Sequence, residues 1–232
     1  MGKIQQGSRW ALQGMIALLV AAPAQAQLAP GYSGQSGTRQ ATDEEYLWAL
    51  GELGACLART KTKQAEAFLA SGRGTPAEDA AVKRLVGYNT ACLSLLNEMG
   101  VERTLLRGTI AEAFYRKLAP APLPEAASSA AAAPGRMSAA SLKALGYDRF
   151  MEGVTACWAA RRPALVHSLL TETKLGSQSE SDAVAAMGPV VAECLPANLK
   201  LKFHPSELRL ALAEAAYKRV AAAKPGPAER AR

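Results

Sequence analysis

The chain has 232 residues and a formal net charge of +7; 49% of its residues are hydrophobic and only 6% are aromatic. Abundant alanine and few β-branched runs favour helices over sheets. The basic residues are scattered and are not interleaved with aromatic ones, which argues against a nucleic-acid-binding surface. Such a charge either keeps a protein soluble or attracts it to anionic polymers and lipids.

Residues 1–26 have the pattern of a secretory signal peptide. A basic start is followed by an apolar run at residues 11–22, and small residues flank the glutamine in the sequence AQA that ends at Ala26. A membrane anchor is the alternative, but spanning a bilayer takes about 18 or more apolar residues, and this run is shorter. We therefore predict cleavage after Ala26 and a periplasmic or secreted product without a transmembrane segment.

After a leader at residues 27–42, rich in Gly, Ser and Gln, a helical unit is predicted over residues 43–119. Its first helix carries an apolar stripe at i, i+4, i+7 and i+11. The stripe consists of Tyr46, Leu50, Leu53 and Leu57.

Two further helices are predicted before residue 100. A short one covers residues 64–70 and stops at the sequence SGRG. The next starts at a capping-box pattern, with Thr75 as N-cap and Glu78 three residues later, and its apolar stripe continues to Cys92. We expect the same three helices in the second half, where the third runs from about residue 179 to 195.

The fourth helix of the unit is a sequence that occurs twice in the chain. Residues 107–119 (RGTIAEAFYRKLA) and residues 209–221 (RLALAEAAYKRVA) share Arg, Ala, Glu, Ala, Tyr and Ala at the same offsets. The first-helix stripe also recurs, 101 residues later. These matches predict an all-α protein made of two tandem, duplicated four-helix units. The second unit covers residues 138–223; a Pro/Ala-rich linker at 120–137 precedes it, and a disordered tail at 224–232 follows it.

The four cysteines of this exported chain are expected to form disulfides. Because each unit holds two of them, duplication selects the pairs Cys56–Cys92 and Cys157–Cys194 among the three connectivities. Each bond should join the first helix of a unit to its third. Zinc binding and redox catalysis are the alternatives, but the short Cys-x-x-Cys spacing that they use is absent.

Arg107 and Arg209 put a charge in line with the apolar stripe of each repeated helix. One interpretation is structural: a buried guanidinium needs a carboxylate or the carbonyls that end another helix. The other is functional: the two arginines form an anion-binding or partner-binding pair where the units meet.

Two further pairs of charges stand four residues apart on the repeated helices. They are Glu112 with Arg116 and Glu214 with Lys218. Pairs at this spacing support helices by a few tenths of a kcal/mol, and we expect these to lie at the surface.

No sequence motif in the chain indicates chemistry. It contains none of the motifs typical of metalloproteases, serine hydrolases, phosphate-binding loops or covalent haem attachment, and we assign no catalytic residue, metal ligand or cofactor. We therefore predict an exported, non-catalytic binding or envelope-accessory protein, whose partner is another protein or an anionic envelope polymer. The alternatives are a small-molecule or anion-binding protein with its site between the units, and an envelope enzyme without a recognisable motif.

Overall fold

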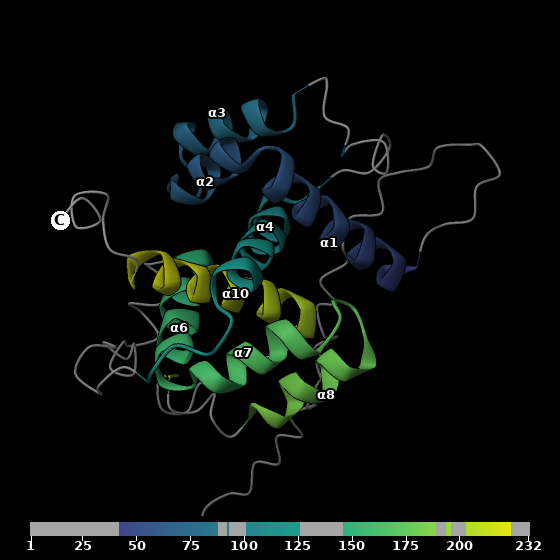
Figure 1. Cartoon of the computed structure of the whole chain (residues 1–232), viewed down its shortest axis with the longest axis vertical. Coiled ribbons are helices and arrows are strands. Elements are labelled where there is room, and N and C mark those ends of the chain that lie inside the picture. Colours follow the sequence, from purple (N-terminus) through teal and green to yellow (C-terminus); the bar gives the residue numbers. More distant parts are fainter. Residues whose placement is uncertain are drawn as a thin grey trace, which may run out of the picture. The chain divides into compact units, whose positions relative to one another are not determined.

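The computed structural model of the chain describes residues 42–87, 92, 101–125, 146–188, 194–195 and 203–223. The predicted signal peptide, the leader before Thr42, the linker after residue 125 and the tail from residue 224 lie outside these residues. All described residues belong to one compact unit, Gln40–Arg232, and this part of the chain contains helices but no strand (Figure 1).

The first repeat, residues 43–119, contains the four helices that its sequence predicts. They are α1 (Asp43–Thr60), α2 (Thr62–Ala70), α3 (Pro76–Leu85) and α4 (Arg103–Leu118). The predicted start of α3 is confirmed, because the Thr75 hydroxyl accepts a hydrogen bond from the Glu78 amide. In α1 the three leucines of the predicted stripe are buried, and Thr42 and Glu45 form a reciprocal capping box.

The second repeat, residues 138–223, follows the same order. Its helices are α6 (Tyr147–Arg161), α7 (Pro163–Glu172), α8 (Gln178–Ala186) and α10 (Pro205–Ala223). The stripe residues Met151, Val154 and Trp158 are buried, but Tyr147, in the first turn of α6, is 61% exposed. The sequence therefore predicted the fold class and the helix order of both repeats.

The third helix of each repeat is shorter than predicted. Helix α3 ends at Leu85 and α8 ends at Ala186, before the cysteines that were expected on them. The residues that follow continue a helix poorly: Gly87 after α3, and Gly188 and Pro189 after α8. Proline in particular has no N–H for the carbonyl four residues earlier.

Both predicted disulfides are present, Cys56–Cys92 and Cys157–Cys194, with sequence separations of 36 and 37 residues. Each bond ties the first helix of its repeat to the segment that follows the third helix, and not to the third helix itself. Disulfides persist in oxidising compartments and indicate a non-cytoplasmic environment. Within the described ranges, no helix combines the length and the apolar character that crossing a bilayer requires.

The repeated helices α4 and α10 pack against each other at the centre of the fold, while α1 packs on α4 and α6 on α10 (Figure 1). The crossing is close at Gly108, where an added Cβ would lie 2.8 Å from the backbone oxygen of Leu210. These two residues stand at equivalent places in the repeated sequences. The repeats therefore meet through equivalent surfaces, as the subunits of a two-fold symmetric dimer do.

The tyrosine of each repeated helix contacts the other repeat. Tyr115 of α4 is buried in the core of the second repeat, and its hydroxyl is 3.0 Å from His167 Nδ1. Tyr217 of α10 stacks on Phe114 of the first repeat, with ring centroids 5.5 Å apart. The repeated sequences, which form α4 and α10, thus make the interface between the two repeats.

Candidate functional site

The interface between the repeats contains a buried charge network built on Arg107, which is 1% exposed. Its Nη2 donates to Glu214 of α10 at 2.9 Å, and its Nη1 donates to Glu78 of α3 at 3.1 Å. The same guanidinium donates to the carbonyls of Phe68 and Leu69 at the end of α2, at 2.8 and 2.9 Å. It therefore both neutralises carboxylates and caps a helix.

Arg209 repeats this arrangement in the other direction and is fully buried. Its Nε and Nη2 donate to the two carboxylate oxygens of Glu112 at 2.8 and 2.9 Å, and Glu180 lies 3.7 Å away. It also donates to the carbonyls of Leu170 and Thr173, near the end of α7. Glu180, Leu170 and Thr173 each stand 102 residues after a partner of Arg107, namely Glu78, Phe68 and Ser71, whose carbonyl accepts from Arg107 Nη2 at 3.2 Å. Glu112 stands 102 residues before Glu214.

The two arginines thus exchange partners, because each one binds the glutamate of the other repeated helix. The predicted i,i+4 pairs are also present, Glu112–Arg116 at 2.8 Å and Glu214–Lys218 at 3.1 Å. However, Glu112 is 8% exposed and Glu214 is 2% exposed. The prediction that these glutamates lie at the surface is wrong, because each carboxylate turns inward to the buried arginine of the opposite repeat.

The environment of Glu214 holds this carboxylate in its charged form. Burial alone would raise the pKa of Glu214, but the hydrogen bonds and charge of Arg107, with the charges of Arg73 and Lys218, lower it to about 2. Glu214 is therefore ionised at neutral pH and joins the repeats through charge-assisted hydrogen bonds from Arg107.

Of the two interpretations of Arg107 and Arg209, this geometry favours the structural one. Both guanidiniums face carboxylates and the carbonyls that end a helix, as that interpretation requires. Neither belongs to the lining of the groove on the surface of this unit, and an anion would have to displace glutamates to reach them.

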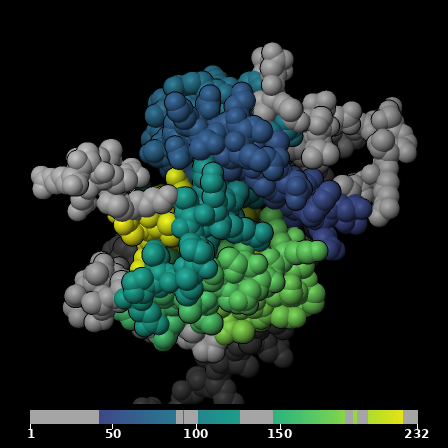
Figure 2. All heavy atoms as spheres, in the orientation of Figure 1, coloured from purple at the N-terminus to yellow at the C-terminus, as the bar shows by residue number. Residues whose placement is uncertain are grey.

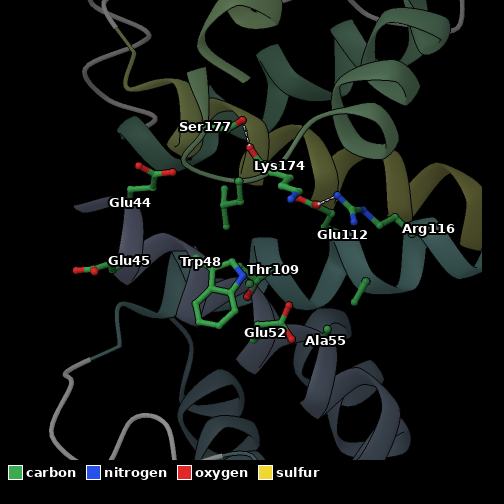
Figure 3. Close-up of a pocket in the computed structure, with 13 residues that line it drawn as sticks. Glu44, Glu45, Trp48, Glu52, Ala55, Thr109, Glu112, Arg116, Lys174 and Ser177 are labelled. Atoms are coloured by element: carbon green, nitrogen blue, oxygen red, sulfur yellow. Dashed lines mark hydrogen bonds and ion pairs between the residues drawn. The ribbon is translucent and has the colours of Figure 1, made fainter. Parts of the chain in front are cut away.

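A groove of about 640 Å³, which we call the first groove, lies on the surface of the described part (Figure 3). Its floor is α4, one wall is α1, and the other is the loop between α7 and α8. In Figure 2 the teal spheres of α4 lie between the blue spheres of the α1 side and the green spheres of α7 and α8. It is lined by Glu44, Glu45, Trp48, Gly51, Glu52 and Ala55 of α1, Thr109, Glu112, Ala113 and Arg116 of α4, and Lys174, Leu175 and Ser177 of the loop.

Trp48 is the prominent side chain of the first groove, because it is 59% exposed. Glu44 and Glu52 stand four residues before and after it, so the three side chains share one face of α1. Figure 3 shows the indole ring with these carboxylates on either side. Among the described residues, neither carboxylate takes part in an ion pair.

The positive charges of the first groove are Arg116, on α4 at its floor, and Lys174, on the loop opposite α1. Arg116 already binds Glu112 and donates to the Leu170 carbonyl at 2.7 Å. The loop is held against α1 at Gly176, whose φ is 79°, a value that L side chains rarely adopt. An added Cβ there would lie 3.3 Å from the Leu47 Cβ, so the glycine permits the close approach of loop and helix.

A second groove of about 260 Å³ occupies the equivalent place in the other half. Seven of its lining residues are the counterparts of first-groove residues, at offsets of 101 in the first helices and 102 elsewhere. In the order first groove, second groove, they are Gly51 and Glu152, Ala55 and Ala156, Thr109 and Ala211, Glu112 and Glu214, Ala113 and Ala215, Arg116 and Lys218, and Leu175 and Arg73. The duplication has therefore produced two grooves, which differ in size and charge.

Sequence reasoning missed the first groove, although one signal for it was available. Trp48 lies two residues from Tyr46 and falls outside the apolar stripe of α1, so its position predicts an exposed side chain. Glutamates at both i−4 and i+4 strengthen that signal. The opposite wall could not be predicted, because it comes from a loop more than 120 residues later in the chain.

The grooves offer no further signature of a known activity. Among the residues that the structure describes, no three His, Cys, Asp or Glu side chains gather closely enough to hold a metal ion. Comparison of the chain with protein-family models, with curated protein sequences and with solved structures found no match.

Proposed function

We propose that this protein is an exported, non-catalytic binding protein whose ligand lies in the first groove against Trp48. The observation that carries the proposal is the 59% exposure of this tryptophan in a groove of about 640 Å³. A large aromatic ring left in solvent costs stability, whereas a ligand that covers it gains apolar contact. The free carboxylates of Glu44 and Glu52 would orient that ligand.

A binding role is supported over a catalytic one by the state of the hydroxyls in the first groove. The Thr109 hydroxyl donates to the Leu106 carbonyl at 3.0 Å, and the Ser177 hydroxyl donates to the Lys174 carbonyl at 2.6 Å. The Ser177 oxygen also caps α8 by accepting from the Glu180 amide. Both hydroxyls thus donate to backbone carbonyls, whereas an activated nucleophile donates to an adjacent base.

The proposed compartment is the periplasm or the extracellular space, with the signal peptide removed after Ala26. Support comes from the two disulfides and from the pattern of the first 26 residues. The partner would then be a protein or polymer of the envelope. An anionic polymer is less well supported at this groove than a protein, because its α1 wall is acidic.

The proposal is tested by titrating the protein with three classes of probe in a calorimeter. The probes are short basic peptides, short acidic peptides and neutral oligosaccharides. We expect one class to bind saturably, and we expect Trp48→Ala to raise its Kd at least tenfold. Leu165→Ala is the matched control, because Leu165 is an exposed apolar residue (43%) outside both grooves, and its replacement should leave Kd within twofold.

Two results would contradict the proposed function. One is that none of the three classes binds. The other is that a class binds the wild type and Trp48→Ala with the same Kd. Circular dichroism of each variant checks that the fold is intact, which is expected because the Trp48 side chain is mostly in solvent.

A further inference from the structure

The second groove contains an arginine that the first groove lacks. Arg73, from the loop between α2 and α3, places its Nη2 at 2.5 Å from Glu214 Oε2 and is 18% exposed. Lys218 there binds both Glu152 and Glu214, at 2.6 and 3.1 Å, and Arg219 donates to the Pro124 carbonyl at 3.0 Å. The second groove thus holds a cationic side chain that the protein itself supplies.

The equivalent position in the first groove is Leu175, which cannot provide a charge. As a result the two equivalent glutamates have different numbers of cationic partners. Glu214 is contacted by Arg107, Lys218 and Arg73, whereas Glu112 is contacted by Arg209 and Arg116. Lys174 of the same loop lies in the lining of the first groove, but no loop side chain there pairs with Glu112 as Arg73 pairs with Glu214.

The charge of the two linings differs in the same direction. The first groove has four carboxylates and two cations in its lining, and the second has two carboxylates and three cations. Three of the four carboxylates of the first groove lie on α1, at Glu44, Glu45 and Glu52. The counterparts of Trp48 and Glu52 in the second repeat are Arg149 and Gly153, so the acidic, aromatic wall belongs to the first groove alone.

We infer that the ligand of the first groove is a basic segment of a partner polypeptide, which inserts an arginine or lysine side chain beside Trp48. This inference rests on the proposed function and names its ligand. A guanidinium or ammonium group would lie on the indole face and between the carboxylates of Glu44 and Glu52. The ligand would thus bring a cationic side chain into the first groove, whereas Arg73 of the chain itself supplies one in the second groove.

The dimensions of the acidic wall favour a peptide over a small cation. Glu44 and Glu52 are eight residues apart on α1, which is about 12 Å along a helix. An extended peptide covers that distance with about four residues, at 3.3–3.6 Å each. A single basic side chain that pairs with one of these carboxylates leaves the other without a partner, whereas a segment with alternate basic residues can pair with both.

The test is a titration of the protein with heptapeptides of one design, in which three alternate positions carry arginine, citrulline or glutamate. Citrulline keeps the shape of arginine without its charge. We expect the arginine peptide to bind at least tenfold more tightly than the citrulline peptide, and the glutamate peptide not to bind. Free arginine is titrated in parallel, and affinity equal to that of the peptide would overturn the assignment to a polypeptide.

Two variants of the protein separate this groove from its counterpart. Leu175→Arg introduces the cation that the second groove holds, and it should weaken the arginine peptide at least tenfold. Arg73→Leu makes the reverse change in the second groove, and it should leave the Kd of the arginine peptide within twofold. If Leu175→Arg does not fold, Glu44→Gln combined with Glu52→Gln gives the same test, with a loss of at least threefold.

The outcomes distinguish the ligand class from the proposed function. If the citrulline peptide, an acidic peptide or an oligosaccharide binds as well or better, and Trp48→Ala abolishes that binding, the inferred ligand is wrong while the binding function stands. If no probe depends on Trp48, both fail. Unchanged binding in both the Leu175→Arg protein and the Glu44→Gln, Glu52→Gln protein also overturns the inference.

Discussion

Arg107→Met should lower the free energy of unfolding by about 3–5 kcal/mol, the usual cost of removing one member of a buried ion pair. The guanidinium is 1% exposed and donates to Glu214, to Glu78 and to the carbonyls of Phe68 and Leu69. Methionine fills a similar volume but donates no hydrogen bond, so buried acceptors lose their partner. Against a typical stability of about 5–15 kcal/mol, this is a large loss.

Urea denaturation followed by circular dichroism, with the disulfides intact, measures the cost of this replacement. The matched control is Arg116→Met, because Arg116 pairs with a glutamate of the same network but is 45% exposed. An exposed pair contributes about 0–1 kcal/mol. Combining Arg107→Met with Glu214→Gln should cost about 0.5–3 kcal/mol less than the sum of the single changes, because the residues interact directly. If Arg107→Met costs no more than the control, the network does not hold the repeats together.

Four further predictions concern stability. The pKa of Glu214 is about 2 in the folded protein and ordinarily 4.5. Its contribution of about 3 kcal/mol to the free energy of unfolding is therefore complete above pH 4.5 and is lost as pH falls towards 2. Urea titrations at several pH values should show that Glu214→Gln flattens this pH dependence. Gly108→Ala should cost about 1–3 kcal/mol by overpacking the helix crossing. Gly153→Ala, where an added Cβ meets nothing within 4 Å, should instead stabilise α6 by about 0.5–1 kcal/mol. Thermal melts of both glycine variants measure these two effects. Replacing Cys56 and Cys92 together with serine should cost about 3–4 kcal/mol, and an unchanged urea midpoint would contradict that value.

The sequence alone predicted those parts of the fold that depend on local pattern and on duplication. The stripe of α1, the N-cap at Thr75 and the pairing of Cys56 with Cys92 all followed from spacing, and each is confirmed. Helix ends were less predictable. The apolar stripe of α3 continues past Gly87 in the sequence, but the helix ends at Leu85. Apolar spacing alone does not take into account that a glycine lowers helix propensity.

The position of Glu112 and Glu214 was mispredicted for a physical reason. Each has a basic residue four positions later, and that pattern normally marks the surface of a helix. Their burial depends on an arginine that lies 97 or 107 residues away in the chain. Contacts of that kind depend on how the repeats pack. In the sequence, they are indicated only by the recurrence of Arg and Glu at the same positions of both repeated helices.

The exchange of partners across α4 and α10 also accounts for the existence of two grooves. In an interface with two-fold symmetry, a hollow next to one copy of a surface must recur next to the other. If the two grooves were identical, both would bind the same ligand. Here Arg73 lines the second groove and pairs with Glu214, while the first has the uncharged Leu175 at that position and Trp48 on its wall. The same Arg–Glu pairs are buried on both sides of the interface while the surfaces beside them differ, which is why we propose a ligand for the first groove only.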